Sequence, residues 1–157
     1  MTGCLNSSTP KKVVIELPLP GFTSLCQPKA KVIVSKDRGG SQVHRANNVN
    51  SYEVAHYRID GVVIKDGKKC DYLLLNEDKR VAYFIELKGQ DLTWAAQQIE
   101  ATEITLRDSL SNYPDRRYRI VANKCRTHNI EHSGFKKYRD KWYGRLRYES
   151  LRIEEDL

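Results

Sequence analysis

A carboxylate and an ammonium group interrupt an apolar, strand-like run near the middle of the chain. The run is VAYFIELKGQ at residues 81–90, in which Glu86 and Lys88 are two positions apart. Side chains two residues apart in a β-strand point to the same face of the sheet. The spacing therefore predicts that both charged groups project together from a segment whose other residues favour burial.

A third charged residue, Asp71, lies at the start of another apolar run, CDYLLL at residues 70–75. An antiparallel hairpin whose turn is the polar segment at residues 76–80 would pair Asp71 with Glu86. Paired residues share a face and have Cβ atoms ~5 Å apart. The sequence thus predicts that Asp71, Glu86 and Lys88 meet at one end of a hairpin.

Two carboxylates that face each other across a ladder repel, and a divalent cation between them would remove that cost. Mg²⁺ prefers carboxylate oxygens and keeps several waters. Beside such a metal, Lys88 could orient a water molecule or stabilise charge on a phosphate, which is the chemistry of metal-assisted phosphodiester hydrolysis. The alternative is an exposed strand end where Lys88 forms an ordinary ion pair with Glu86 or Asp71, and such pairs contribute little to stability.

The surrounding segments predict the elements that would position these residues. SYEVAHYRIDGVVI at residues 51–64 is β-rich, and with the two apolar runs it predicts an antiparallel meander. Apolar positions at helical spacing predict a helix over residues 92–110, with Asp91 as its N-cap. RRYRIVANKC at residues 116–125 predicts a buried strand that joins the sheet after the helix. This order predicts an α/β sandwich with a mixed central sheet.

The arrangement resembles the PD-(D/E)XK nuclease superfamily, which has a restriction-endonuclease-like core that Holliday-junction resolvases also have. In that core an Asp starts the second strand of a meander and Glu-x-Lys ends the third, before a helix and a further strand. Asp71, Glu86 and Lys88 match these positions, although Cys70 stands where the family name has proline. The resemblance covers roughly residues 53–125. It implies a nuclease that uses Mg²⁺ or Mn²⁺ held by Asp71 and Glu86.

The resemblance also implies roles for residues outside the three-residue set. Some members carry a catalytic Gln on the helix, and Gln98 matches it, with an ordinary helix-surface amide as the alternative. Many use an upstream acid as a further metal ligand. Glu53 is the candidate, with a solvent-facing strand residue as the alternative. The carbonyl of Leu87 would be an additional ligand, whereas Asp60 is expected in a turn or bulge far from Asp71.

The net charge of +7 is concentrated in one part of the chain, because residues 113–148 contain eleven Lys or Arg and three acids. A basic region favours a polyanionic partner, most often nucleic acid. Aromatic residues alternate there with basic ones, a mixture that suits single-stranded or distorted nucleic acid. The alternative is an aromatic core with basic side chains at its rim. The basic candidates for nucleic-acid binding are Lys136, Lys137, Arg139, Lys141 and Arg145.

The length predicts one domain over residues 1–157. Residues 1–50 contain four of the five prolines and predict an irregular arm or cap, residues 51–125 the nuclease-like core, and residues 126–157 a basic aromatic region. No apolar run reaches the ~20 residues that span a bilayer, and the first residues lack the pattern of a secretion signal. We therefore expect a cytoplasmic protein that binds no membrane, with its scattered cysteines reduced.

Cys125, His128 and His132 have a spacing that could supply three zinc ligands, but a structural site needs a fourth, so polar loop residues are the favoured interpretation. The leading hypothesis is a metal-dependent nuclease with DNA as its expected substrate, in repair, junction resolution, a mobile element or defence. The alternatives are a nucleic-acid-binding accessory subunit of the same fold that does not cut, and an interaction subunit with an acidic partner. A homodimer or a place in a larger complex also fits.

Overall fold

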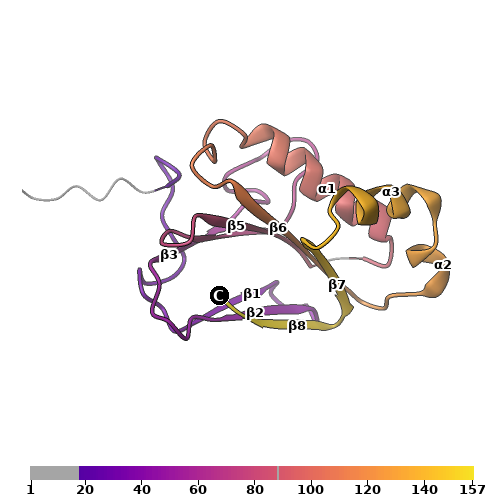
Figure 1. Ribbon diagram of the computed structural model, residues 1–157, viewed down its shortest axis with the longest axis horizontal. Coiled ribbons are helices and arrows are strands. Elements are labelled where there is room, and N and C mark those ends of the chain that lie inside the picture. Colours follow the sequence, from indigo (N-terminus) through magenta and orange to yellow (C-terminus); the bar gives the residue numbers. More distant parts are fainter. Residues whose placement is uncertain (1–17, 88) are drawn as a thin grey trace, which may run out of the picture.

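A computed structural model describes residues 18–87 and 89–157 (Figure 1). The helices in this part of the chain are too short or too polar to cross a membrane. The described elements are, in chain order, β1 (Val32–Lys36), β2 (Val43–Asn47), β3 (Val54–Arg58), β4 (Tyr72–Asn76), β5 (Val81–Glu86), α1 (Leu92–Thr105), β6 (Asp115–Ala122), α2 (Thr127–Ile130), α3 (Ser133–Lys141), β7 (Leu146–Ser150) and β8 (Arg152–Asp156).

The strands form two sheets that face each other. The central sheet has five strands in the order β3-β4-β5-β6-β7. Strands β3, β4 and β5 make the predicted antiparallel meander, and β6 and β7 continue it in parallel with β5. The second sheet has the order β1-β2-β8. Figure 1 shows α1 and α3 on one face of the central sheet and the small sheet on the other, so the α/β class predicted from the sequence is confirmed.

The central strands are apolar on both faces because both faces are covered. Leu73 and Leu75 of β4 belong to the core cluster on the helix side, which also contains Ile99 of α1. Tyr72 and Leu74, in the alternate positions, belong to the cluster beneath the small sheet. Burial on both faces removes the usual alternation of apolar and polar residues. This explains why these strands read as continuous apolar runs.

Helix α1 begins as predicted and ends earlier than predicted. Trp94 N–H donates to the carboxylate of Asp91 at 3.0 Å, which confirms Asp91 as the N-cap. The helix ends at Thr105, and the chain continues in turns. Leu106 and Leu110 are nevertheless buried in the core. The apolar spacing beyond residue 105 therefore reflected burial and was not evidence of a longer helix.

Within residues 1–50, expected as an irregular arm or cap, the sequence also predicts a short strand in KVIVSKDRGG at residues 31–40. Strand β1 confirms that strand, and β2 is a second strand in the region. Strands β1 and β2 form an antiparallel pair, and β2 is joined in parallel by β8. Both strands alternate between buried and more exposed residues, as expected for a sheet with only one face covered. Residues 1–17 lie outside the described residues. They include most of the segment KKVVIELPLPGF at residues 11–22, for which the sequence predicts a short edge strand. The region from residue 126 onward, which the sequence left unassigned, contains α2, α3, β7 and β8.

Candidate functional site

The ends of β4 and β5 meet in the register that the sequence predicts. Tyr72 pairs with Ile85, and these two residues are the chain neighbours of Asp71 and Glu86, respectively. The N–H of Asp71 donates to the carbonyl of Ile85 at 3.1 Å. Its carboxylate oxygen Oδ2 accepts from the N–H of Leu87 at 2.8 Å. Asp71 and Glu86 therefore lie side by side at one end of the central sheet.

Both carboxyl groups are buried, with exposed fractions of 2% for Asp71 and 5% for Glu86. By strand alternation they lie on the helix side of the sheet, whereas Ile85 and Leu87 belong to the cluster beneath the small sheet. Burial raises the pKa of the neighbouring Cys70 thiol, and the charges of Glu86 and then Asp71 raise it further. Two carboxylates thus influence one buried thiol. At a poorly solvated position of this kind, a bound cation stabilises the charged form of a carboxyl group.

Helix α1 holds the segment that leads into Asp71. The amide oxygen of Gln98 accepts from Lys69 N–H at 2.8 Å. One turn further along, the hydroxyl of Thr102 accepts from Cys70 N–H at 2.7 Å and donates to the carbonyl of Gln98 at 3.0 Å. Gln98 is therefore held to the backbone two residues before Asp71, and its amide oxygen accepts from that backbone. Thr102 was not among the predicted site residues, although its position on the buried stripe of the helix was visible in the sequence.

The structure does not bring Glu53 to this group. Its carbonyl accepts from Glu77 N–H at 2.8 Å, and its own N–H donates to Asp78 at 2.7 Å. Its carboxylate lies 3.7 Å from the ammonium group of Lys29. Because β3 runs antiparallel to β4, the start of β3 lies beside the hairpin turn. The length of β4, about 17 Å, separates Glu53 from Asp71. Lys88 lies outside the described residues.

Asp60, expected far from Asp71, lies near it instead. Ile59 N–H donates to the carbonyl of Asp71 at 2.8 Å, so the ladder between β3 and β4 continues to this end of the sheet. The carboxylate of Asp60 is 3.7 Å from the ammonium group of Lys69. The segment KDGKK at residues 65–69 predicts a tight turn centred on Asp66 and Gly67, which would shift the pairing of β3 along β4. The observed connection is longer, because the chain first turns back on itself between residues 59 and 64.

Within residues 18–87 and 89–157, no group of three or more His, Cys, Asp or Glu side chains could hold a metal ion. The protein donors at the sheet end would be the carboxylates of Asp71 and Glu86 and the backbone carbonyl of Leu87. Mg²⁺ is usually bound by one or two carboxylates and keeps several waters, whereas structural zinc needs four N or S ligands. The donor set at this end of the sheet therefore fits a hydrated Mg²⁺ or Mn²⁺ ion.

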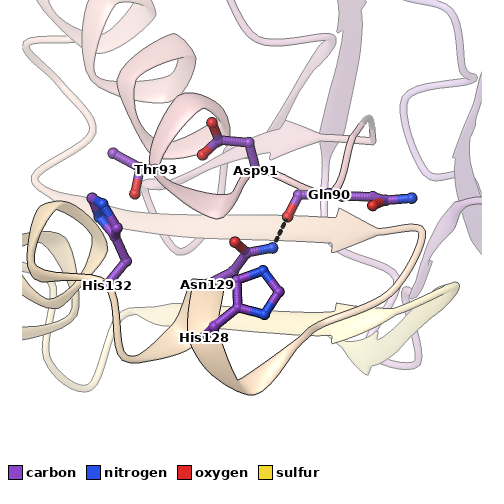
Figure 2. A pocket seen from close by; sticks show the side chains of 6 residues that line it. All are labelled: Gln90, Asp91, Thr93, His128, Asn129 and His132. Carbon is purple, nitrogen blue, oxygen red and sulfur yellow. Dashed lines mark hydrogen bonds between the residues drawn. The ribbon is translucent and has the colours of Figure 1, made fainter.

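A pocket of about 370 Å³ opens at the carboxyl ends of the parallel strands (Figure 2). Asn123, just after β6, donates its N–H to the carbonyl of Gly89 at 3.1 Å, so the loops after β5 and β6 are in contact. Asn129 of α2 donates its side-chain N–H to the carbonyl of Gln90 at 2.6 Å. Ligands of α/β proteins commonly bind at such strand ends. The described lining residues are Gln90, Asp91, Thr93, His128, Asn129 and His132.

Both histidines of the candidate zinc pattern thus line the pocket, but Cys125 is not among its described lining residues. The N–H of Cys125 donates to the hydroxyl of Ser150 at 2.9 Å, on the β7 side. The ring nitrogen Nδ1 of His132 accepts from Gly134 N–H at 3.1 Å and caps α3. His128 and His132 therefore form part of a pocket wall, which their spacing in the sequence did not indicate.

The aromatic residues of α3, and Trp142 directly after it, belong to the core. Phe135, Tyr138 and Trp142 are buried on the helix side of the central sheet. The ring centroids of Tyr118 and Trp142 are 4.1 Å apart in a stacked arrangement. These rings cannot stack on nucleic-acid bases, which supports the core alternative for them. Tyr143, with 89% of its surface exposed, is the exception in this region.

The basic candidates around α3 differ in how their charges are used. Lys141 lies 2.8 Å from a carboxylate oxygen of Glu100, and Arg139 lies 3.9 Å from Glu131. The guanidinium of Arg145 lies 5.5 Å from the centroid of the Tyr118 ring. Lys136 and Lys137 are exposed on α3. Internal ion pairs therefore offset part of the positive charge that the sequence assigns to nucleic-acid binding.

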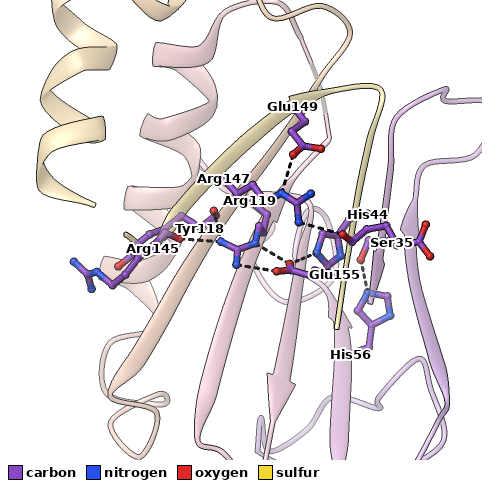
Figure 3. A network of polar contacts seen from close by, with 10 residues as sticks. Ser35, His44, His56, Tyr118, Arg119, Arg145, Arg147, Glu149 and Glu155 are labelled. Carbon is purple, nitrogen blue, oxygen red and sulfur yellow. Dashed lines mark hydrogen bonds and ion pairs between the residues drawn. The ribbon is translucent and has the colours of Figure 1, made fainter. Parts of the chain in front are cut away.

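A second polar cluster lies between the two sheets and serves the fold (Figure 3). Arg119 of β6 donates twice to Glu155 of β8, at 2.7 and 2.9 Å, and His44 of β2 lies 2.8 Å from the same carboxylate. Burial opposes ionisation of Glu155, but its bonds to His44 and Arg119 outweigh burial and lower its pKa to about 2. Nearby, burial and the proximity of His44 lower the pKa of His56 to about 4. The carboxylate is thus charged and the His56 ring neutral at pH 7.

Comparisons of the chain with models of protein families, with curated proteins and with solved structures give no match. The geometry at the end of the central sheet is therefore the basis for a functional assignment. Asp71 and Glu86 are buried at the ends of neighbouring strands, and α1 holds the segment before Asp71. A polar pocket lies on the chain segment that follows Glu86.

Proposed function

We propose that the protein is a Mg²⁺-dependent nuclease with a restriction-endonuclease-like core, and that it hydrolyses phosphodiester bonds in DNA. The observation that carries the proposal is the meeting of Asp71 and Glu86, both buried, at one end of the central sheet. The sequence places Lys88 two residues after Glu86. The order of meander, α1 and parallel β6 supports the resemblance to PD-(D/E)XK nucleases.

Each residue has a role that follows from its chemistry. Asp71 and Glu86 would hold the ion, together with the carbonyl of Leu87. Bound Mg²⁺ supplies Lewis-acid polarisation of the phosphoryl group and lowers the pKa of a bound water. The ammonium group of Lys88 would orient the attacking water and stabilise negative charge on the phosphate. Gln98 positions the backbone before Asp71 through Lys69 N–H.

A nucleic-acid-binding subunit that does not cut is the second candidate. The position of Glu53 favours it, because this acid lies at the far end of β4 and cannot join the carboxyl pair. Members of the superfamily with an upstream acid would have a third ligand there. The presence of Asp71, Glu86 and Lys88 together favours the enzyme.

The two candidates differ in metal-dependent cutting. Purified protein is incubated with supercoiled, single-stranded and branched DNA in Mg²⁺, Mn²⁺ or EDTA. We expect cleavage with either metal and none in EDTA. The substitutions Asp71→Asn, Glu86→Gln and Lys88→Ala should each reduce the rate by about 100-fold or more, the loss typical when one group that acts on the transition state is removed.

Glu53→Gln is the matched control, because it neutralises a carboxylate at the other end of the same meander, directly before β3. It should cut at the wild-type rate within about threefold, a difference of less than 1 kcal/mol in activation free energy. Binding without cutting would support the accessory subunit. Cutting that persists in EDTA or in Glu86→Gln would contradict the proposed enzyme.

A further inference from the structure

The polar pocket lies close to the carboxyl pair along the chain. Gln90, at its wall, follows Glu86 by four residues. Four residues of extended chain span at most ~14 Å. Four stacked nucleotides, at 3.4 Å each, cover a similar length. A nucleotide in the pocket would thus belong to the stretch of nucleic acid that passes the carboxyl pair.

The described residues of the pocket offer both hydrogen-bond donors and acceptors. Nδ1 of His132 accepts from Gly134 N–H, so the neutral ring carries its proton on Nε2 and can donate. Asn129 binds the carbonyl of Gln90 through its side-chain N–H, which leaves its amide oxygen as an acceptor (Figure 2). The Thr93 hydroxyl can do either, and the Asp91 carboxylate accepts.

This lining does not suit a bare phosphate, because it includes the carboxylate of Asp91 and, among the described residues, neither Lys nor Arg. The edge of a nucleobase presents donors and acceptors together, as the pocket does. The exposed ring of His128 provides a flat surface, and proteins use His rings to stack bases that have left a helix. A volume of about 370 Å³ is within the range of small-molecule sites.

We infer that this pocket binds an unpaired nucleobase of the substrate, an inference that rests on the proposed nuclease function. A base in continuous duplex is paired and stacked, so its edge cannot enter a pocket unless it is extruded. The preferred substrate class is therefore nucleic acid with an unpaired nucleotide close to the cleaved bond, such as a bulge, flap or branch.

Binding without metal tests the pocket separately from cleavage. In EDTA, the full chain is titrated with a paired DNA hairpin and with the same hairpin carrying a one-nucleotide bulge of fluorescent 2-aminopurine. We expect wild-type protein to bind the bulged DNA about tenfold more tightly and to change the emission of the bulged base. This preference is of the size that one stacked base contributes.

Two substitutions remove the expected contacts without removing the fold. His132→Asn loses the Nε2 donor but keeps an acceptor that can cap α3, because Asn is a good N-cap residue. His128→Ala removes the exposed ring. Each should reduce the preference for bulged DNA severalfold. Arg107→Ala, an exposed change after the far end of α1, should leave it unchanged, and thermal unfolding should show that all variants fold.

The outcomes separate the two proposals. Equal binding of paired and bulged DNA by the wild type, or an unchanged preference in both histidine variants, overturns the pocket inference, even if the protein cuts DNA in Mg²⁺. A preference that depends on His128 and His132 supports the pocket. If that preference occurs without cutting in any metal, the nuclease proposal fails while the binding site stands.

Discussion

Asp71 and Glu86 place two buried carboxyl groups side by side at one end of the central sheet. The proposed metal would bind this pair in the folded chain, and a ligand that binds only the folded chain stabilises it. The stability of the protein should therefore depend on divalent cations.

We predict that Mg²⁺ raises the thermal midpoint of the wild type. A ligand at 100 times its dissociation constant stabilises the fold by about 2.7 kcal/mol, which for a chain of this length corresponds to roughly 5–10 °C. Glu86→Gln should lose this response. Thermal unfolding with MgCl₂ or EDTA measures it. Glu53→Gln should respond as the wild type does, and an equal response in Glu86→Gln would contradict the prediction.

The register of Asp71 and Glu86 could be predicted because a short polar segment separates two apolar runs, which leaves few ways to pair them. The position of Asp60 could not be predicted, because the connection from β3 to β4 is long and contains a turn of its own. The roles of His128 and His132 depend on the contact of Asn129 with Gln90, 39 residues earlier in the chain. Local patterns carry no information about such a contact.

At the scale of elements, α1 acts as a brace for the start of β4. Thr102 is fully buried, and its hydroxyl accepts the N–H of Cys70. A proline at position 70 would lack an N–H and would leave this hydroxyl without that donor. Cys70 and Thr102 are thus a matched pair that joins the helix to the strand carrying Asp71.

Thr102→Val tests the brace, since valine has nearly the same shape but cannot accept a hydrogen bond. A buried N–H left without an acceptor costs about 1–3 kcal/mol. We expect the free energy of unfolding in urea to fall by that amount, and cleavage to fall as Asp71 loses its support. Thr105→Val, at the exposed end of the same helix, should change stability by less than about 0.5 kcal/mol. Equal losses in the two variants would contradict the role of Thr102.

The elements that were predicted correctly have either strong periodicity or full burial. Strands β4, β5 and β6 read as apolar runs, and α1 has both a cap and a buried stripe. Strands β2 and β8 have five residues each and one covered face, so their apolar content is low. The parallel pairing of β2 with β8 has no hairpin to indicate it. It arises from tertiary packing.

At the scale of the whole molecule, Arg119, His44 and Glu155 join the two sheets through charged groups. Glu155 has a pKa of about 2 in the folded protein, below its ordinary value of 4.5, and its side chain is only 11% exposed. As the pH falls, the Glu155 carboxylate is therefore protonated at a higher pH in the unfolded chain than in the folded protein. The contribution of Glu155, roughly 3 kcal/mol, is complete above about pH 4.5 and is lost toward pH 2.

His56 acts in the same direction at higher pH. Its pKa of about 4 lies below the ordinary 6.5, so the unfolded chain again binds the proton first. We predict that the free energy of unfolding decreases from pH 6.5 downward in two overlapping stages, from His56 and then Glu155. Urea unfolding at a series of pH values measures this decrease. Glu155→Gln should lower stability at pH 7 and flatten the stage between pH 4.5 and 2, and an unchanged pH profile in this variant would contradict the prediction.

The sheet of β1, β2 and β8 also governs when the chain can finish folding, because Val43 in β2 pairs with Arg152 in β8, roughly a hundred residues later. During translation, β4 and β5 leave the ribosome well before β8, and one face of their hairpin, with Tyr72 and Leu74, lacks its final cover until residue 156 has emerged. A nascent chain that stalls earlier would present this apolar face to chaperones. The order of synthesis thus makes closure of this face a late step in the folding of these strands.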